Sequence, residues 1–227
     1  MDYKKLRRFL EKNEYLFLLI FLLAFLLLPS FFINPKIKTG AIYGFLIAVI
    51  VIGIYELSES NHSFWAGVFF GIIALISNSI FVSENIDLIF LIRMGSLISF
   101  FGLLTIHLLI RISKTRTINT NLIYGAISGY ILIGLIGGMG FRLINHFYSN
   151  SFIFGNGLEA KIDDLTYFSF ITLSSLGYGD ITPVTPPGQS LSVFISICGQ
   201  MYTAIVIGII IGKFILIKKE RESNINT

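Results

Sequence analysis

The chain has 227 residues, of which 54% are hydrophobic and 13% are charged. Soluble globular domains carry about 25% charged residues, so this composition excludes an ordinary water-soluble protein. The net charge is +4, but the basic residues fall between apolar stretches, which favours the membrane surface over nucleic acid as their partner. One cysteine, Cys198, excludes an internal disulfide framework and a multi-cysteine metal site.

Six apolar stretches are long enough to cross the hydrocarbon core, which takes about 20 apolar residues in a helix. They cover residues 15–33, 39–57, 64–82, 86–112, 120–147 and 188–217. The first follows a basic segment but is too long for a secretory signal and lacks a small-residue cleavage site. We therefore expect an all-α membrane protein with six transmembrane helices.

Lysine and arginine collect on one side of this predicted topology. With the N-terminus inside, the inside carries Lys4, Lys5, Arg7, Arg8, Lys12, Arg111, Lys114, Arg116, Lys218, Lys219 and Arg221. The outside then carries Lys36, Lys38 and Lys161. The positive-inside rule predicts that both termini are cytoplasmic. The short loops and the Ile-, Leu- and Phe-rich composition suit a prokaryotic plasma membrane.

The segment between the fifth and sixth stretches has a different pattern. Residues 148–162 are polar, and the run 163–174 is too short to span a membrane. A glycine-bearing stretch and Pro183, Pro186 and Pro187 follow. Non-helical backbone survives at membrane depth only where it is buried in protein or lines a water-filled cavity. This pattern predicts a re-entrant pore helix and loop.

The sequence Thr-Leu-Ser-Ser-Leu-Gly-Tyr-Gly-Asp at residues 172–180 resembles the signature of the potassium channel family. The resemblance covers residues 120–217. It implies a selectivity filter formed by Ser175, Leu176, Gly177, Tyr178 and Gly179, with potassium bound at the first four. It also implies that Asp180 lies at the outer mouth, that Tyr167 and Phe168 support the filter, and that Tyr167 hydrogen-bonds Asp180.

Elementary stereochemistry explains these residue types. A desolvated potassium ion needs a cage of backbone carbonyl oxygens, and carbonyls that all face one axis require left-handed dihedrals at alternate residues. Glycine adopts these without steric penalty, which accounts for Gly177 and Gly179. We expect Leu176 and Tyr178 to point away and wedge against the pore helix. Two departures are Leu176 for the family's usual valine and Ser175 for its usual threonine.

One pore loop cannot enclose an axis, so the resemblance implies a homotetramer with three further copies in a lipid bilayer. Potassium is then the permeant ion, and we expect no cofactor and no nucleic-acid partner. The predicted domains are a four-helix transmembrane domain (1–117), a pore domain (118–217) and a short cytoplasmic tail (218–227). The tail is too short for an appended ligand-binding domain.

Glycines in the last two stretches permit close helix contacts. Gly134 and Gly138 have the small-xxx-small spacing of such contacts. Gly199 lies at the family's usual hinge position, where we expect it to face a cavity lined by residues such as Ile195 and Thr203. Close packing against a neighbouring helix is the alternative explanation of Gly199.

Six helices with a pore loop before the sixth helix are also the topology of voltage-gated channels. The fourth stretch, 86–112, however, lacks the row of gating charges that a voltage sensor needs. A sensor needs about 3–4 gating charges per subunit on one helical face. Steps of three residues from Arg93 reach Phe90, Ser96, Ser99 and Gly102. We expect Arg93 to reach the interface or to pair with Asp87 or Glu84. We expect interfacial positions for His107, Arg111, Arg142 and His146.

Four other interpretations remain. A cation transporter subunit usually carries four pore loops in one chain, whereas this chain has one. A nonconducting regulatory subunit of a related channel would not need an intact filter, and Tyr178 argues against a nonselective cation channel. A membrane enzyme comes last, because the sequence contains no recognisable Ser-His-Asp set or phosphate loop. We therefore expect a channel and not an enzyme.

Overall fold

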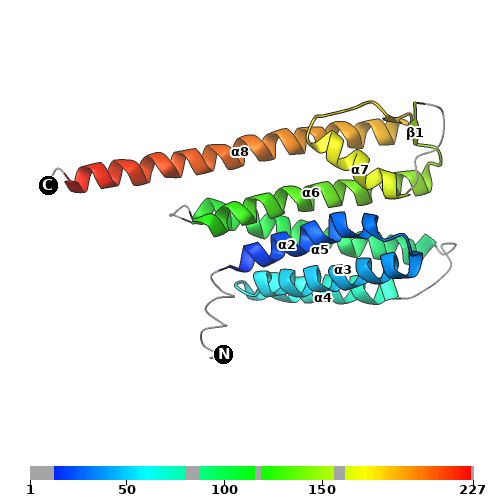
Figure 1. Cartoon of the computed structure of the whole chain (residues 1–227), viewed down its shortest axis with the longest axis horizontal. Coiled ribbons are helices and arrows are strands. Elements are labelled where there is room, and N and C mark those ends of the chain that lie inside the picture. Colours follow the sequence, from blue (N-terminus) through cyan, green and yellow to red (C-terminus); the bar gives the residue numbers. More distant parts are fainter. Residues whose placement is uncertain (1–12, 80–86, 116–118, 156–161, 226–227) are drawn as a thin grey trace. The chain divides into compact units, whose positions relative to one another are not determined.

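The computed structural model describes residues 13–79, 87–115, 119–155 and 162–225, and Figure 1 shows the order of its elements. The helices are α2 (Glu14–Leu27), α3 (Pro35–Leu57), α4 (Asn61–Ser79), α5 (Asp87–Lys114), α6 (Thr120–Phe147), α7 (Ile162–Leu173) and α8 (Pro186–Ile225). A short 3-10 helix, η1 (Leu28–Phe31), continues α2, and two short strands, β1 (Phe152–Phe154) and β2 (Ile181–Pro183), flank α7 in the sequence.

Among the described residues, six helical stretches are long and apolar enough to cross a membrane, and they coincide with the six predicted ones. The predicted fold class, an all-α membrane protein, is therefore confirmed. Helix α3 begins at Pro35, earlier than expected, because the Asn34 side chain accepts a hydrogen bond from the backbone N–H of Lys36 at 3.0 Å. Residues 80–82 of the third predicted stretch lie outside the described residues.

Helix α8 is longer than the sequence suggested. We expected the last transmembrane stretch to end near residue 217 and a short charged tail to follow, either as an extension of the helix or without regular structure. The helix extension is what the structure has, since α8 continues without interruption to Ile225. The polar sequence after residue 217 ends the apolar pattern but contains no proline or glycine that would stop a helix.

The chain forms two compact units. The first draws its described residues from Met1–Phe69, Leu103–Gly129 and Ile205–Thr227. Its core consists of fully buried apolar side chains of α2, α3 and α5, among them Leu18, Leu22, Val49, Ile50 and Leu104. The ring of Tyr15 packs against Gly125, where a Cβ would lie 3.1 Å from the ring, and the backbone N–H of Tyr15 donates to Asn121 at 3.2 Å.

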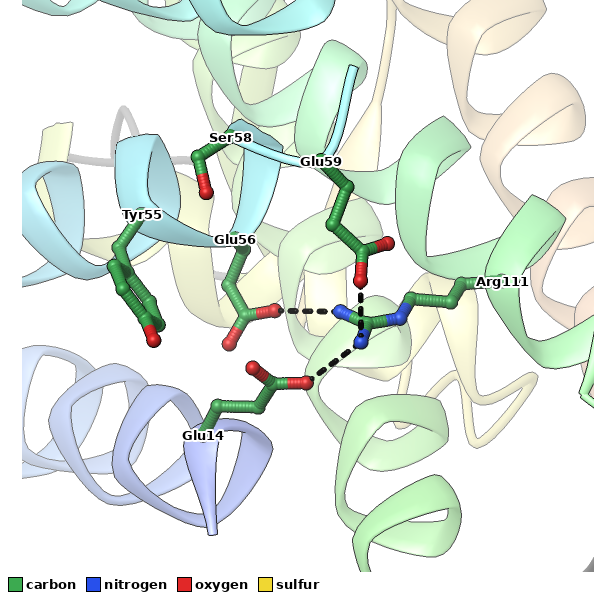
Figure 2. A pocket seen from close by; sticks show the side chains of 6 residues that line it. All are labelled: Glu14, Tyr55, Glu56, Ser58, Glu59 and Arg111. Carbon is green, nitrogen blue, oxygen red and sulfur yellow. Dashed lines mark hydrogen bonds and ion pairs between the residues drawn. The ribbon is translucent and has the colours of Figure 1, made fainter. Parts of the chain in front are cut away.

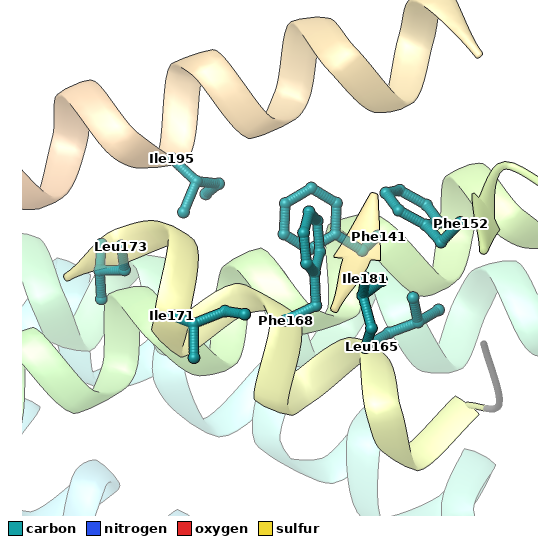
Figure 3. Close-up of a cluster of buried hydrophobic side chains, with 8 residues drawn as sticks. All are labelled: Phe141, Phe152, Leu165, Phe168, Ile171, Leu173, Ile181 and Ile195. Atoms are coloured by element: carbon teal, nitrogen blue, oxygen red, sulfur yellow. The ribbon is translucent and has the colours of Figure 1, made fainter. Parts of the chain in front are cut away.

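The second unit comprises Phe70–Gly102 and Tyr130–Ala204, with the same gaps in its described residues. Figure 3 shows its buried apolar cluster, to which α6, α7, α8 and both strands contribute. The cluster consists of Phe141, Phe152, Leu165, Phe168, Ile171, Leu173, Ile181 and Ile195. Strands β1 and β2 pair antiparallel, with Ile153 opposite Thr182. The cluster and the strand pair together fix both ends of the segment that follows α7.

Two glycines of α6 let α7 approach closely, as their spacing predicted. A Cβ at Gly134 would lie 2.4 Å from the Phe170 ring, and one at Gly138 would lie 3.1 Å from the backbone of Thr166. The Ser169 hydroxyl donates to the carbonyl oxygen of Gly134 at 2.7 Å. A buried polar group is thereby satisfied where the two helices meet.

Gly199 lies where α8 meets the end of α7. A Cβ at this position would lie 1.9 Å from the carbonyl oxygen of Leu173, so only glycine fits. The structure thus supports the close-packing explanation, while the hinge role stays a prediction. The expected position of Ile195 is wrong: its side chain is buried in the apolar cluster and does not line a cavity, whereas Thr203 is exposed.

We predict that Gly199→Ala destabilises the protein. The new methyl group would collide with backbone, which cannot turn aside, so the helices must separate at a cost of roughly 1–3 kcal/mol. Gly208→Ala on the same helix is the matched control, because no described atom lies within 4 Å of its Cβ position. Thermal unfolding in detergent would show a lower midpoint for the first variant only; equal midpoints would contradict the packing role.

Candidate functional site

The segment that follows α7, residues 174–180, is called the Gly-Tyr-Gly segment below. Helix α7 is held in place by Leu165, Phe168 and Leu173, which are all buried in the cluster of Figure 3. At the end of α7 the carbonyl oxygen of Ile171 accepts two hydrogen bonds, from the backbone N–H of Leu176 at 2.9 Å and of Gly177 at 3.1 Å. The chain therefore leaves the helix through a fixed turn.

Three alternate residues of this segment have left-handed backbone conformations. The φ angles are 56° at Ser175, 52° at Gly177 and 75° at Gly179. Residues between them do not have positive φ angles. This is the alternation that turns successive carbonyl groups toward one side of an extended chain, as the sequence predicted for the two glycines.

Sequence reasoning missed the conformation of Ser175. A left-handed backbone costs a non-glycine residue roughly 1–2 kcal/mol, because Cβ approaches the carbonyl oxygen that follows. Such strain persists only where the surrounding structure enforces it, and it gathers at functional sites. The spacing of the glycines could have revealed it: Gly177 and Gly179 lie two residues apart, and the same spacing two residues earlier reaches Ser175.

The end of the segment next to β2 is fixed at Asp180. The Tyr167 hydroxyl donates to Oδ2 of Asp180 at 2.8 Å, which is the predicted hydrogen bond, and the backbone N–H of Ile181 donates to Oδ1 at 3.1 Å. The carbonyl oxygen of Asp180 accepts from the N–H of Gly155 at 3.1 Å, next to the strand pair. The hydrogen bond to Asp180 raises the pKa of the Tyr167 hydroxyl, so the phenol stays protonated at neutral pH.

The end of the segment next to α7 meets two polar side chains of α8 that the sequence did not single out. The amide of Gln200 donates to the hydroxyl oxygen of Ser175 at 2.8 Å. The hydroxyl of Ser196 lies 3.4 Å from the same oxygen. These residues lie one helical turn apart on α8. A serine and a glutamine within an apolar helix are unusual, and this could have marked them as candidate site residues from the sequence alone.

The Gly-Tyr-Gly segment is exposed within a single chain. Residues 174–179 are all exposed, and the side chains of Leu176 and Tyr178 retain 55% and 67% of their accessible surface. The expectation that these two side chains wedge against the pore helix is therefore not met inside one chain. Phe168, by contrast, is buried in the apolar cluster, against Phe141 and Phe152.

Comparison with known proteins finds a family match in the same region. Residues 130–215 match the family model described as an ion channel. Potassium channel K1 of Plasmodium berghei is 59% identical over 32 residues, which cover 14% of this chain and 2% of that protein. A putative potassium channel protein of Rhodopseudomonas palustris is 32% identical over 65 residues, covering 29% of this chain and 16% of that protein.

These residues, 130–215, make up less than half of the chain and are similar to ion channels. They are called the channel domain below. The matched segments span only small parts of the two curated relatives. No solved structure matches the chain. The family is one of ion channels and not of enzymes.

Several charged residues of the chain have definite surroundings. In the channel domain, Arg142 donates to the Thr166 hydroxyl at 3.2 Å, which joins α6 to α7. His146 stacks on Phe90 with ring centroids 4.2 Å apart, and the guanidinium of Arg93 lies 5.7 Å from the centre of the same Phe90 ring. Glu84 and the side chain of Asp87, the expected partners of Arg93, lie outside the described residues.

The position of Arg111 near the end of α5 had suggested only an interfacial role, but the side chain also has specific partners. It forms ion pairs with the carboxylates of Glu14, Glu56 and Glu59. Among the described residues of the whole chain, no group of three or more histidine, cysteine, aspartate or glutamate side chains is arranged to hold a metal ion.

We predict that Gln200→Leu alters the Gly-Tyr-Gly segment at Ser175 without unfolding the channel domain. Leucine is of similar size but leaves the Ser175 hydroxyl without its 2.8 Å donor. We expect the potassium-over-sodium ratio of ion flux to fall by a few-fold, about the effect of one neutral hydrogen bond. Ser196→Ala, which removes the longer 3.4 Å contact, is the control and should change the ratio less. An unchanged ratio in Gln200→Leu would contradict the role.

Proposed function

We propose that this protein is the subunit of a homotetrameric, potassium-selective channel that conducts potassium passively across the plasma membrane. The observation that carries the proposal is the left-handed backbone at Ser175, Gly177 and Gly179. A regular alternation of this kind turns the carbonyl oxygens of Ser175 through Tyr178 into a ladder along one edge of the segment. Carbonyl ladders from several chains around an axis replace the hydration shell of a potassium ion.

The exposure of the segment supports assembly with further copies. A single ladder offers oxygens from one side only, whereas a dehydrated ion needs them all round. Leu176 and Tyr178, more than half exposed in one chain, are large apolar or amphipathic side chains that assembly would bury. Four copies around one axis are the arrangement that the family resemblance implies. In that assembly we propose that Leu176 and Tyr178 pack against pore helices, those of neighbouring subunits included.

The charges around the segment favour cations at both ends. Asp180, held through both carboxylate oxygens, adds negative charge at the proposed outer mouth. The C-terminal end of α7, directly before Ser174, carries the negative end of the helix dipole. The Ser175 hydroxyl, oriented by Gln200, lies at the proposed innermost ion site.

The names of the two curated relatives support potassium as the permeant ion. Both are described as potassium channels, and the Gly-Tyr-Gly-Asp core is intact in this chain. We propose that both termini are cytoplasmic, from the distribution of lysine and arginine. We also propose that the channel is not voltage-gated in the usual way, because α5 lacks a row of basic residues at three-residue steps.

Ion flux from purified protein in liposomes tests the proposal. The liposomes would hold a potassium gradient, with sodium as competitor and barium as blocker. We expect barium-sensitive potassium flux that excludes sodium. Equal flux of both ions would instead favour a nonselective cation channel, through the departures at Ser175 and Leu176. A folded tetramer without flux, even in variants with an opened inner mouth, would favour a nonconducting subunit.

We predict that Gly177→Ala abolishes selective flux while leaving membrane insertion intact. No described atom lies within 4 Å of its Cβ position, so the penalty comes from the φ angle of 52° and not from a clash within the chain. An L-residue there costs roughly 1–2 kcal/mol in every subunit, which favours a rotated carbonyl.

The matched control is Gly155→Ala. This loop glycine also has no described atom within 4 Å of its Cβ position, but its φ is not in the left-handed region. Its backbone N–H, which donates to Asp180, is retained in alanine. Potassium and sodium fluxes should match those of the unmodified protein. Selective flux in Gly177→Ala would show that the filter has been placed at the wrong residues.

A further inference from the structure

A charged cluster lies at one end of the first unit, apart from the Gly-Tyr-Gly segment in the sequence. Figure 2 shows three carboxylates converging on the guanidinium of Arg111 from α2, α3 and the turn after α3. Nη2 of Arg111 lies 2.9 Å from Oε1 of Glu14 and 2.8 Å from Oε1 of Glu59. Nη1 lies 3.5 Å from Oε2 of Glu56. Arg111 thus binds two of the carboxylates closely and the third loosely.

Glu56 is the loosely bound carboxylate, and it is the buried one. Its side chain has 0% of its surface exposed, against 14% for Glu14 and 53% for Glu59. Charge-assisted N–H···O hydrogen bonds are usually about 2.7–2.9 Å, so a separation of 3.5 Å leaves Oε2 weakly paired. Oε1 has no hydrogen-bond partner among the described residues. Buried polar groups rarely stay unsatisfied, so a further donor is expected beside Glu56.

A pocket adjoins this carboxylate. Its volume is about 270 Å³, and its lining consists of Glu14, Tyr55, Glu56, Ser58, Glu59 and Arg111. Among these lining residues, Glu14 and Glu59 face one basic side chain, so the lining keeps an excess of one negative charge even with the buried Glu56 protonated. The lining therefore selects for a cation.

The arrangement favours an organic cation over a metal ion. Within the described residues no three carboxylate, histidine or cysteine groups converge closely enough to hold a metal. Oε1 of Glu56 instead presents a single acceptor, and Arg111 already occupies one oxygen of each glutamate. A primary ammonium group carries three N–H donors and can bind acceptors that lie apart, and Tyr55 adds an aromatic surface that attracts cations.

We propose that this pocket binds a small organic cation with a primary ammonium group, which donates a hydrogen bond to Oε1 of Glu56. The cation neutralises part of the excess negative charge and links α2 and α3 to the Arg111 region of α5. On the proposed topology these residues lie at the cytoplasmic ends of their helices, so the ligand comes from the cytoplasm. The site does not depend on the proposed conduction, because all of its lining residues belong to the first unit.

Isothermal titration calorimetry on the full chain in detergent, at constant potassium chloride, tests the site with methylammonium as the probe. Tetramethylammonium is the matched probe, since it carries the same charge without N–H donors. We expect binding of methylammonium and at least tenfold weaker binding of tetramethylammonium. Equal binding of the two probes would overturn the hydrogen bond to Glu56.

Two variants locate the binding. Glu56→Gln keeps the shape but removes the charged acceptor, and we expect methylammonium to bind about 10- to 100-fold more weakly. Ser58 lines the pocket and is exposed, so the phenylalanine ring of Ser58→Phe would occupy the pocket. This variant should abolish methylammonium binding without changing the net charge of the lining. Ser60→Phe, two residues later and outside the pocket lining, is its control and should bind normally.

The outcome that contradicts the proposal is specific. If methylammonium binds both Glu56→Gln and Ser58→Phe as tightly as it binds the unmodified protein, the cation lies elsewhere and the pocket holds water only. Absence of any measurable binding to the unmodified protein would have the same meaning. Because Ser58 is exposed, its replacement keeps the test valid even where Glu56→Gln fails to fold.

Discussion

The hydrogen bonds of one carbonyl group and one carboxylate determine the course of the chain between α7 and β2. The carbonyl oxygen of Ile171 accepts from Leu176 and Gly177, and the carboxylate of Asp180 accepts from Tyr167 and Ile181. Between these two anchors the backbone has no ladder or helix of its own to hold its dihedral angles. The buried cluster around Phe168 keeps both anchors at fixed positions, so packing in the core of the channel domain controls the orientation of exposed carbonyl groups.

Local patterns predicted much of this structure. The six spans follow from runs of apolar residues, and the positive φ angles of Gly177 and Gly179 follow from their spacing within the signature. Contacts between distant residues were not predictable in this way. The ion pair of Glu56 with Arg111 joins residues 55 positions apart, and Gln200 meets Ser175 only because α8 packs against the end of α7. Ile195 was misplaced for the same reason, since periodicity along one helix does not reveal which face its neighbour covers.

The polar groups around the Gly-Tyr-Gly segment and those around Arg111 differ in how fully they are paired. In the second unit, the hydroxyls of Ser169 and Ser175 and the phenol of Tyr167 each have a defined partner at 2.8 Å or less. In the first unit, the Arg111 cluster leaves one oxygen of buried Glu56 unsatisfied among the described residues. A buried network that is incomplete costs stability, whereas a complete one adds rigidity. The paired groups fit the proposed ion path along the Gly-Tyr-Gly segment, and the unpaired oxygen of Glu56 fits the proposed binding of a cation.

The unbroken course of α8 has a mechanical consequence. At about 1.5 Å per residue, its 40 residues extend roughly 60 Å, about twice the thickness of the hydrocarbon core. Even at a tilt of about 40°, the steepest usual value, roughly 20 Å of helix extends beyond the hydrocarbon core. This projecting part is continuous with the turn of α8 that contacts Leu173 through Gly199. The helix that leaves the hydrocarbon core is therefore the same continuous element that contacts the end of α7, directly before the Gly-Tyr-Gly segment.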